Sequence, residues 1–153
     1  MIQKKLEIWN MKEGILSVEE KRNIHFYSIK NFLIHFNDFQ NTYEKEKVLI
    51  IFNDYFSIIE ENDFILSEQE SRILCYSHIM KIGQYYNHYL GFKVNMGLNG
   101  SIFVGVVLDF ILLVTGSLSQ IYYFPICTLI FVLMNRYKIY YYGKKNKLYG
   151  PRY

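Results

Sequence analysis

The chain has 153 residues, of which 51% are hydrophobic and 18% aromatic, and it carries 17 basic and 14 acidic residues. This length suits one compact domain, or a small domain with an appendage, and the aromatic content excludes an intrinsically disordered protein. Two cysteines exclude a disulfide-rich scaffold, the absence of alanine excludes an Ala-rich coiled coil, and the net charge of +3 does not by itself indicate nucleic-acid binding.

The charged residues are distributed unevenly along the chain. Residues 1–98 hold 11 basic and 13 acidic residues, whereas residues 99–153 hold six basic residues and a single acid, Asp109. All six of those basic residues follow the last long apolar run. We therefore expect two regions of different character, the first typical of a globular domain and the second of a membrane segment.

Apolar residues recur at helical spacing through residues 1–92 and predict a cytoplasmic bundle of three or four amphipathic helices. The first is a short helix that ends near Gly14. Ser17 and Glu20 then form the pattern of a capping box, in which the hydroxyl and the carboxylate bind free amides of the first helical turn. Behind this cap, an apolar stripe at steps of three and four residues predicts one helix that extends to about Tyr43.

Two longer helices complete the predicted bundle. The first covers about 44–61, where two neighbouring apolar stripes indicate a broad buried face. Ser67 and Glu70 repeat the capping-box pattern and begin the second, which reaches about Leu90. A joint that contains glycine, residues 91–95, connects the bundle to the rest of the chain.

Residues 93–142 predict a two-helix transmembrane hairpin, so the predicted fold class is all-α. Residues 102–118 contain a single charge, and a helix over about 94–116 would supply the ~20 residues needed to cross the bilayer core. The uncharged run that follows predicts a second spanning helix over about 121–142. A buried hairpin of a soluble protein would also be apolar on all sides and is the alternative interpretation.

The flanks of the two apolar runs favour the membrane interpretation. Tyrosine rings prefer the headgroup level, and basic residues stay on the cytoplasmic side. We therefore expect two spans with both termini in the cytoplasm and residues 143–153 as a basic cytoplasmic tail. The richness in Ile, Asn, Lys, Tyr and Phe suggests an AT-rich bacterial genome, and hence a bacterial inner membrane. The predicted membrane-surface residues are Tyr137, Lys138, Tyr141, Lys144, Lys145 and Lys147.

Asp109 is the most informative single residue of the predicted hairpin. An ionised carboxylate at the bilayer centre costs at least ~2.5 kcal/mol, so we expect this residue to face protein. Gly97, Ser101 and Gly105 precede it at four-residue steps and form a strip of small residues that admits a second backbone closely. Folding the hairpin at its turn places Thr128 level with Asp109. We predict that these five residues form a helix-packing or partner interface.

No constellation of residues in the sequence predicts catalysis or a cofactor. The glycines form neither a P-loop nor a dinucleotide fingerprint, and no nucleophile elbow or metalloprotease motif occurs. Cys75 and His78 share a helix face, but a second ligand pair at zinc-site spacing does not occur, so Cys75 is more simply interpreted as a core thiol. We expect no catalytic residue, no metal and no cofactor.

Three functions fit these features. The favoured one is a non-enzymatic small integral membrane protein that acts as an accessory or partner-binding subunit of a larger membrane complex. Its expected partners are the lipid bilayer and another membrane protein or a second copy of itself, with no nucleic acid. The alternatives are a bacterial immunity or defence protein or membrane-active effector, and a small homo-oligomeric ion channel that uses Asp109.

Overall fold

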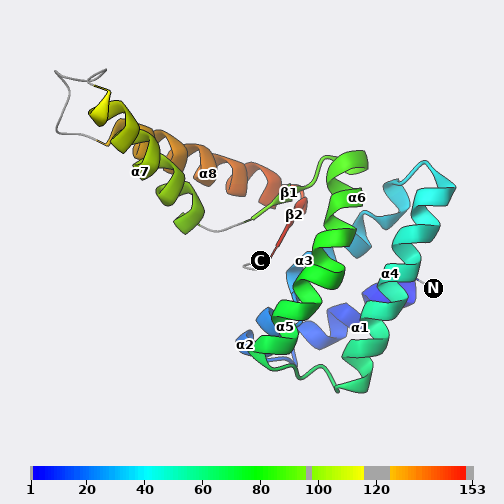
Figure 1. Cartoon of the computed structure of the whole chain (residues 1–153). Helices are drawn as coiled ribbons and strands as arrows, with labels where there is room; N and C mark the ends of the chain where they lie inside the picture. The colour runs from blue at the N-terminus through cyan, green and yellow to red at the C-terminus, as the bar shows by residue number, and fades with distance from the viewer. Residues whose placement is uncertain (1, 96–97, 116–124, 151–153) are drawn as a thin grey trace. The chain divides into compact units, whose positions relative to one another are not determined.

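The computed structural model of the chain describes residues 2–95, 98–115 and 125–150. These residues are mostly helical, which confirms the all-α prediction (Figure 1). The chain divides into two compact units. Unit 1 comprises Met1–Asn95 and Lys145–Tyr153, and unit 2 comprises Met96–Lys144.

The N-terminal part of unit 1 begins as the periodicity predicts. Helix α1 covers Ile2–Glu13, and α2, Val18–Asn23, begins at the predicted capping box. The Ser17 hydroxyl accepts a hydrogen bond of 3.2 Å from the amide of Glu20, whose carboxylate accepts one of 2.7 Å from the amide of Ser17. This predicted cap is confirmed.

The helix predicted to run on to Tyr43 is interrupted at His25, which has a left-handed backbone (φ 52°). Helix α3, Phe26–Ile34, follows the break, and a short 3₁₀ turn, η1, covers Phe36–Asp38. The interruption is stabilised from outside the helix: the Trp9 indole donates to the carbonyl of Phe26 at 3.0 Å, and the Tyr55 hydroxyl donates to that of Ile24. These tertiary hydrogen bonds override the local helical period.

The two longer helices lie close to their predicted positions. Helix α4 covers Thr42–Glu61. Helix α5, Glu68–Leu74, begins at the second capping box, which is also confirmed, and it continues through η2, Cys75–Ile79, into α6, Met80–Leu90. The η2 segment is one π-helical turn, a feature that the sequence did not predict.

Unit 1 also contains a small parallel sheet that the sequence did not predict. Strand β1, Lys93–Val94, pairs with β2, Leu148–Tyr149 (Figure 1). Residues 143–153 were predicted as a basic cytoplasmic tail without regular structure of their own, yet Leu148 is fully buried and Tyr149 is only 2% exposed. Polar side chains of α3 hold this segment, because Asn31 donates to the carbonyl of Leu148 at 2.8 Å and Ser28 accepts from the amide of Gly150 at 3.1 Å.

Unit 2 is a helical hairpin. Helix α7 covers Leu98–Val114 and packs along α8, Ile126–Lys144 (Figure 1). Helix α7 begins later than the predicted position 94, because residues 93–94 form β1. The segment that joins the two helices, including the predicted span ends at 116 and 121, lies outside the described residues.

The predicted transmembrane character of this hairpin is wrong. Among the described residues, no helix combines the length and the apolar character needed to cross a membrane. Helix α7 has 17 residues, fewer than the ~20 that a bilayer core requires, and the uncharged part of α8 ends at Asn135, one residue before Arg136. The prediction of a two-span inner-membrane protein with cytoplasmic termini is therefore corrected.

Candidate functional site

Three of the five predicted packing residues meet between α7 and α8. The Asp109 carboxylate accepts three hydrogen bonds from the first turn of α8: from the amide of Cys127 at 2.8 Å, and from the amide and the hydroxyl of Thr128 at 2.9 and 2.7 Å. These amides have no partner within their own helix. Asp109 therefore caps the N-terminus of α8 from the neighbouring helix.

Gly105 lies one turn before Asp109 and lets the two backbones approach each other. A β-carbon at Gly105 would lie under 3.0 Å from the backbone of Thr128, so no larger residue fits without displacement. Gly97 lies outside the described residues. Ser101 belongs to α7, but its side chain is outside the described part of the structure. The strip is thus described only at its C-terminal end.

The electrostatics of Asp109 favour a structural role. Partial burial raises the pKa of this carboxyl, but hydrogen bonds from Thr128 and Cys127 outweigh that effect and hold the pKa below its usual value. The carboxylate is therefore ionised at neutral pH, and both of its oxygens already accept hydrogen bonds. This arrangement suits a helix cap better than an ion pathway.

The six residues predicted for a membrane surface belong to both units. In unit 2, Tyr137 and Tyr141 stack with ring centroids 6.0 Å apart, and the Lys144 ammonium lies 4.5 Å from the Tyr140 ring. In unit 1, the Lys147 ammonium donates to the carbonyl of Leu90 at 2.8 Å. The imidazole of His35 donates to the carbonyl of Lys145 at 3.0 Å, and Lys138 belongs to α8. The membrane role predicted for these six residues depended on two membrane-spanning helices, and no described helix can cross a membrane.

The hairpin of unit 2 exposes many large apolar side chains. Phe103 and Phe110 on α7 are 70% and 65% exposed, and Met134 on α8 is 63% exposed. Within the described residues from Leu98 to Met134, Asp109 is the only one that carries a charge. We call this uncharged apolar exterior of α7 and of residues 126–134 the hairpin surface.

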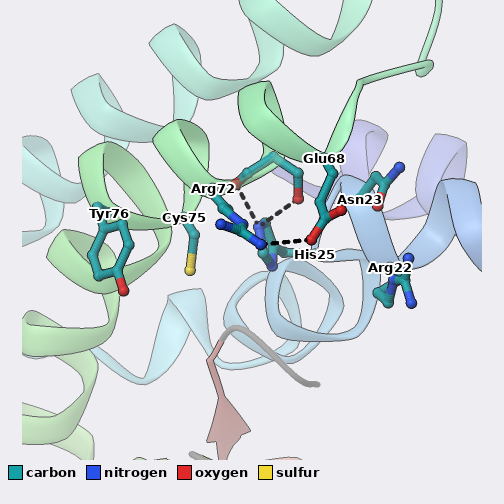
Figure 2. Close-up of a pocket in the computed structure, with 8 residues that line it drawn as sticks. Arg22, Asn23, His25, Glu68, Arg72, Cys75 and Tyr76 are labelled. Carbon is teal, nitrogen blue, oxygen red and sulfur yellow. Dashed lines mark hydrogen bonds and ion pairs between the residues drawn. The ribbon is translucent and has the colours of Figure 1, made fainter.

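Unit 1 contains a cavity of about 610 Å³ that the sequence did not predict (Figure 2). Its walls come from the end of α2, from His25 between α2 and α3, and from the α5–η2 segment. The helix break at His25 and the π-helical turn η2 therefore both border the cavity. The lining side chains are Arg22, Asn23, His25, Glu68, Ser71, Arg72, Cys75 and Tyr76.

His25 is the most deeply buried of the polar residues that line this cavity, with 3% of its surface exposed. The Nε2 atom of His25 lies 3.0 Å from the carbonyl oxygen of Ser71. Because a carbonyl oxygen can only accept a hydrogen bond, the ring proton is on Nε2 and Nδ1 is unprotonated. Within the described part of the chain, Nδ1 has no hydrogen-bond partner. Burial lowers the pKa of His25, although the hydrogen bond to Ser71 opposes the shift, so the imidazole is neutral at pH 7.

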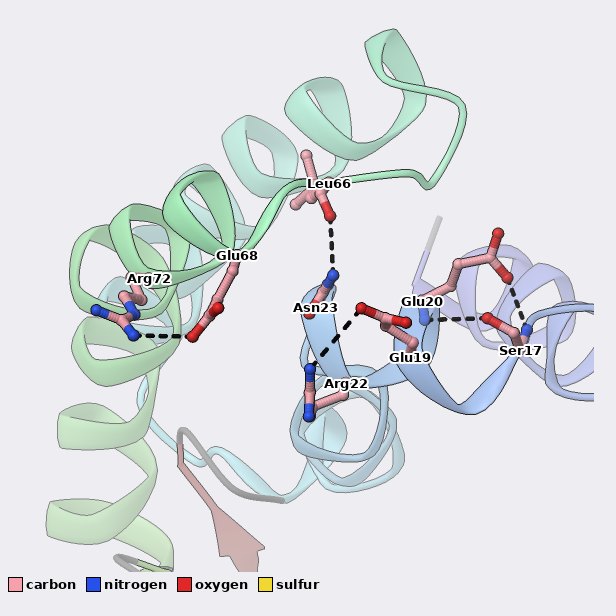
Figure 3. A network of polar contacts seen from close by, with 8 residues as sticks. All are labelled: Ser17, Glu19, Glu20, Arg22, Asn23, Leu66, Glu68 and Arg72. Atoms are coloured by element: carbon pink, nitrogen blue, oxygen red, sulfur yellow. Dashed lines mark hydrogen bonds and ion pairs between the residues drawn. The ribbon is translucent and has the colours of Figure 1, made fainter.

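Three of the side chains that line the cavity are charged, namely Arg22, Glu68 and Arg72. Figure 3 shows Arg72 paired with Glu68 at 2.8 Å and Arg22 near Glu19 at 4.0 Å. All four side chains are mostly exposed, so these pairs contribute little to stability and can rearrange. Asn23, in contrast, is buried and donates to the carbonyl of Leu66 at 2.9 Å.

Cys75 lines the cavity without the properties of a nucleophile or a metal ligand. Burial raises the pKa of this thiol to about 11, so it is protonated at neutral pH. In the described ranges of the chain, no group of three or more His, Cys, Asp or Glu residues is placed to hold a metal ion.

A second polar cluster joins Ser77, His78 and Asp54. The Ser77 hydroxyl lies 2.7 Å from His78 Nδ1, and His78 Nε2 lies 2.8 Å from the Asp54 carboxylate. The order of residues resembles that of a catalytic triad, but Ser77 donates its proton to the carbonyl of Ile73 at 2.7 Å rather than to the histidine. The cluster therefore joins α4 to η2 as a structural contact.

Comparison of the chain with protein-family models, with curated proteins and with solved structures found no match.

The buried histidine gives unit 1 a defined pH dependence. Because burial lowers the folded-state pKa of His25, the unfolded chain binds the proton more readily, and stability should fall as the pH drops below about 6.5. Urea unfolding between pH 5 and 8, followed by the fluorescence of Trp9, measures this effect. His25→Gln should flatten the profile, whereas the exposed His88→Gln should leave it unchanged; equal profiles for His25→Gln and the wild type would contradict the assignment.

Proposed function

We propose that the chain is a non-enzymatic subunit that binds a protein partner through the hairpin surface of unit 2. The observation that carries this proposal is the combination of large exposed apolar side chains with the absence of charge along that surface. Exposed apolar residues that occur singly are ordinary, but contiguous ones mark interaction sites. A helix that is apolar on all sides requires more cover than one neighbouring helix can give.

The chemistry of the hairpin surface defines the partner that it fits. The single carboxylate, Asp109, is engaged by the first turn of α8, so the surface offers no charge for a complementary ion pair. A partner must therefore present apolar helices or an apolar groove. We expect binding to depend on buried area rather than on salt bridges.

A second copy of this chain is a specific candidate for that partner. Two uncharged hairpins do not repel each other, and side by side they form a four-helix bundle, in which each hairpin covers the other. The absence of charge on the hairpin surface favours this candidate. Another protein with an apolar helical surface would satisfy the same requirement.

The mass of the purified full chain in solution tests the proposal. We expect an assembly heavier than the 18.4 kDa chain, and we expect the double variant Phe103→Glu/Phe110→Glu to lose the association, because buried glutamates without partners are costly. Ile50→Glu is the matched control, since Ile50 is similarly exposed but belongs to unit 1. Light scattering after size exclusion gives the masses.

A photo-crosslinker at Phe110, compared with one at Ile50, then distinguishes the two candidate partners. Crosslinking of Phe110 to a second copy supports self-association, and crosslinking to one other protein supports a heteromeric subunit. A monomeric wild type whose Phe110 crosslinks to nothing more than Ile50 does would contradict the proposed function.

A further inference from the structure

We infer that the partner of the hairpin surface is a second copy of the chain, which packs its α7 antiparallel against α7. This inference rests on the proposed function and adds to it the residues of the contact and their direction. The contact residues are Phe103, Val106, Phe110 and Leu113 of α7, which we call the α7 seam.

The α7 seam has the spacing of a stripe along which two helices pair. Its members follow one another at steps of three, four and three residues, the alternation by which one helix packs along another of the same kind. Their exposed fractions are 70%, 51%, 65% and 50% in chain order, so the described residues leave at least half of each side chain uncovered. A second helix with the same spacing covers such a stripe, and α7 of another copy has it.

The α7 seam lies to one side of the contact between α7 and α8. Gly105 and Asp109 mark that contact on α7, and on a helix of 3.6 residues per turn the seam residues lie about 80° to 160° around the axis from Gly105. Leu129 and Leu133 of α8 lie about 100° and 140° in the same sense from Thr128, the residue that Gly105 meets. Because α7 and α8 run in opposite directions, these rotations point to the same side of the hairpin (Figure 1). A second hairpin on that side covers both helices.

The charges of the hairpin decide the direction of the contact. Arg136, Lys138 and Lys144 all lie in the second half of α8, and the carboxylate of Asp109 is engaged by the first turn of α8. A parallel contact would place the basic residues of both copies at the same end. An antiparallel contact separates the two basic ends by roughly the length of α7, about 25 Å for 17 residues, which is about three Debye lengths at physiological salt. The repulsion between them is then screened.

One register of the antiparallel contact lets every seam residue meet another seam residue. In a twofold contact, residue i meets residue j of the other copy and j meets i. An axis at position 108 places Phe103 opposite Leu113 of the second copy and Val106 opposite Phe110 of the second copy. Moving the axis toward either end of α7 leaves Phe103 or Leu113 without a seam residue opposite.

Disulfide formation between cysteine variants tests the direction. Phe103→Cys and Leu113→Cys are made in separate full chains that also carry Cys127→Ser, whereas Cys75 stays, because it is buried. In the antiparallel contact Phe103 and Leu113 lie at the same level, whereas the two copies of Phe103 lie about 15 Å apart along the axis, beyond the reach of a disulfide. We expect an interchain disulfide in the mixture of the two variants and none in either variant alone.

The control and the other outcomes separate this inference from the proposed function. Val104→Cys mixed with Leu113→Cys should give no disulfide, since Val104 is 44% exposed but lies on the other side of α7. Disulfides of Phe103→Cys and of Leu113→Cys each with itself would show a parallel contact and overturn the inference. A dimer by light scattering without a disulfide in the mixture would also overturn it, and both results leave the proposed function standing. A monomeric chain whose Phe110 position crosslinks to another protein overturns only the second copy as partner.

The dissociation constant of the dimer, from sedimentation equilibrium of the full chain, gives a readout without added cysteines. Phe110→Ala should raise it about thirtyfold or more, because truncation removes a ring from the seam of both copies. The ring is 65% exposed in the hairpin, so its removal leaves the packing of α7 on α8 intact. Val104→Ala is the matched control and should raise the constant less than about threefold. Equal dissociation constants for the two variants would overturn the seam.

Discussion

Replacing Tyr149 with alanine should destabilise unit 1 by about 3–5 kcal/mol, the usual loss for a large aromatic residue in a core. The ring is 2% exposed and lies 5.4 Å from the Phe32 ring, centroid to centroid. It also occupies the space that Gly83 leaves open on α6, where a β-carbon would lie under 3.0 Å from the tyrosine ring. The side chain thus fills a site shaped for it.

Backbone contacts tie the same residue to the rest of unit 1. The amide of Asn95 donates to the carbonyl of Tyr149 at 2.7 Å, and the amide of Lys93 donates to the carbonyl of Lys147 at 3.0 Å. Loss of the ring removes the apolar contact that holds β2 beside β1. We therefore expect the whole C-terminal segment of unit 1 to detach together with the side chain.

Urea unfolding of the full chain measures the loss, because Trp9 is the only tryptophan and is buried in unit 1. Tyr140→Ala, at a residue that is mostly exposed on α8, is the matched control and should change stability by less than about 0.5 kcal/mol. Gly83→Ala should also destabilise unit 1, whereas Gly14→Ala, which has open space around it, should not. A loss below about 1 kcal/mol for Tyr149→Ala would contradict the packing.

Features of the fold that depend on neighbouring residues were predictable from the sequence. The capping boxes at Ser17 and Ser67 need only four consecutive residues each, and α4 follows from a continuous apolar period. The approach of Thr128 to Asp109 followed from counting residues along a folded hairpin. In each case the determining contacts are local or related by a simple turn.

Features that depend on distant contacts were not predictable. The helix is interrupted at His25, where Trp9 and Tyr55 from other helices donate to the carbonyls of Phe26 and Ile24. The carbonyl that His25 itself binds belongs to Ser71, 46 residues along the chain. Strand β1 forms because Leu148 and Tyr149 return to unit 1 after the whole of unit 2. The hydropathy that predicted membrane spans did not indicate that α7 begins only at Leu98.

Gly105→Leu should disrupt unit 2 by about 3 kcal/mol, at the upper end of the usual cost of overpacking. The contact is with the backbone of Thr128, which cannot rotate away as a flexible side chain can. The helices must therefore separate, and separation also draws the first turn of α8 away from the Asp109 carboxylate. One substitution thus removes both the close packing and the cap.

Hydrogen exchange of the full chain, read by mass spectrometry on peptides from α7 and α8, measures this loss of protection. The amides at the start of α8 should exchange fastest, since they lose the acceptor that Asp109 provides, and Asp109→Leu should expose the same amides while disturbing the rest of α7 less. Val106→Leu is the matched control, because that side chain is half-exposed on the same helix. If Gly105→Leu and Val106→Leu gave the same exchange, the close approach at Thr128 would not hold the hairpin together, and the hairpin surface would lack the rigid support that partner binding requires.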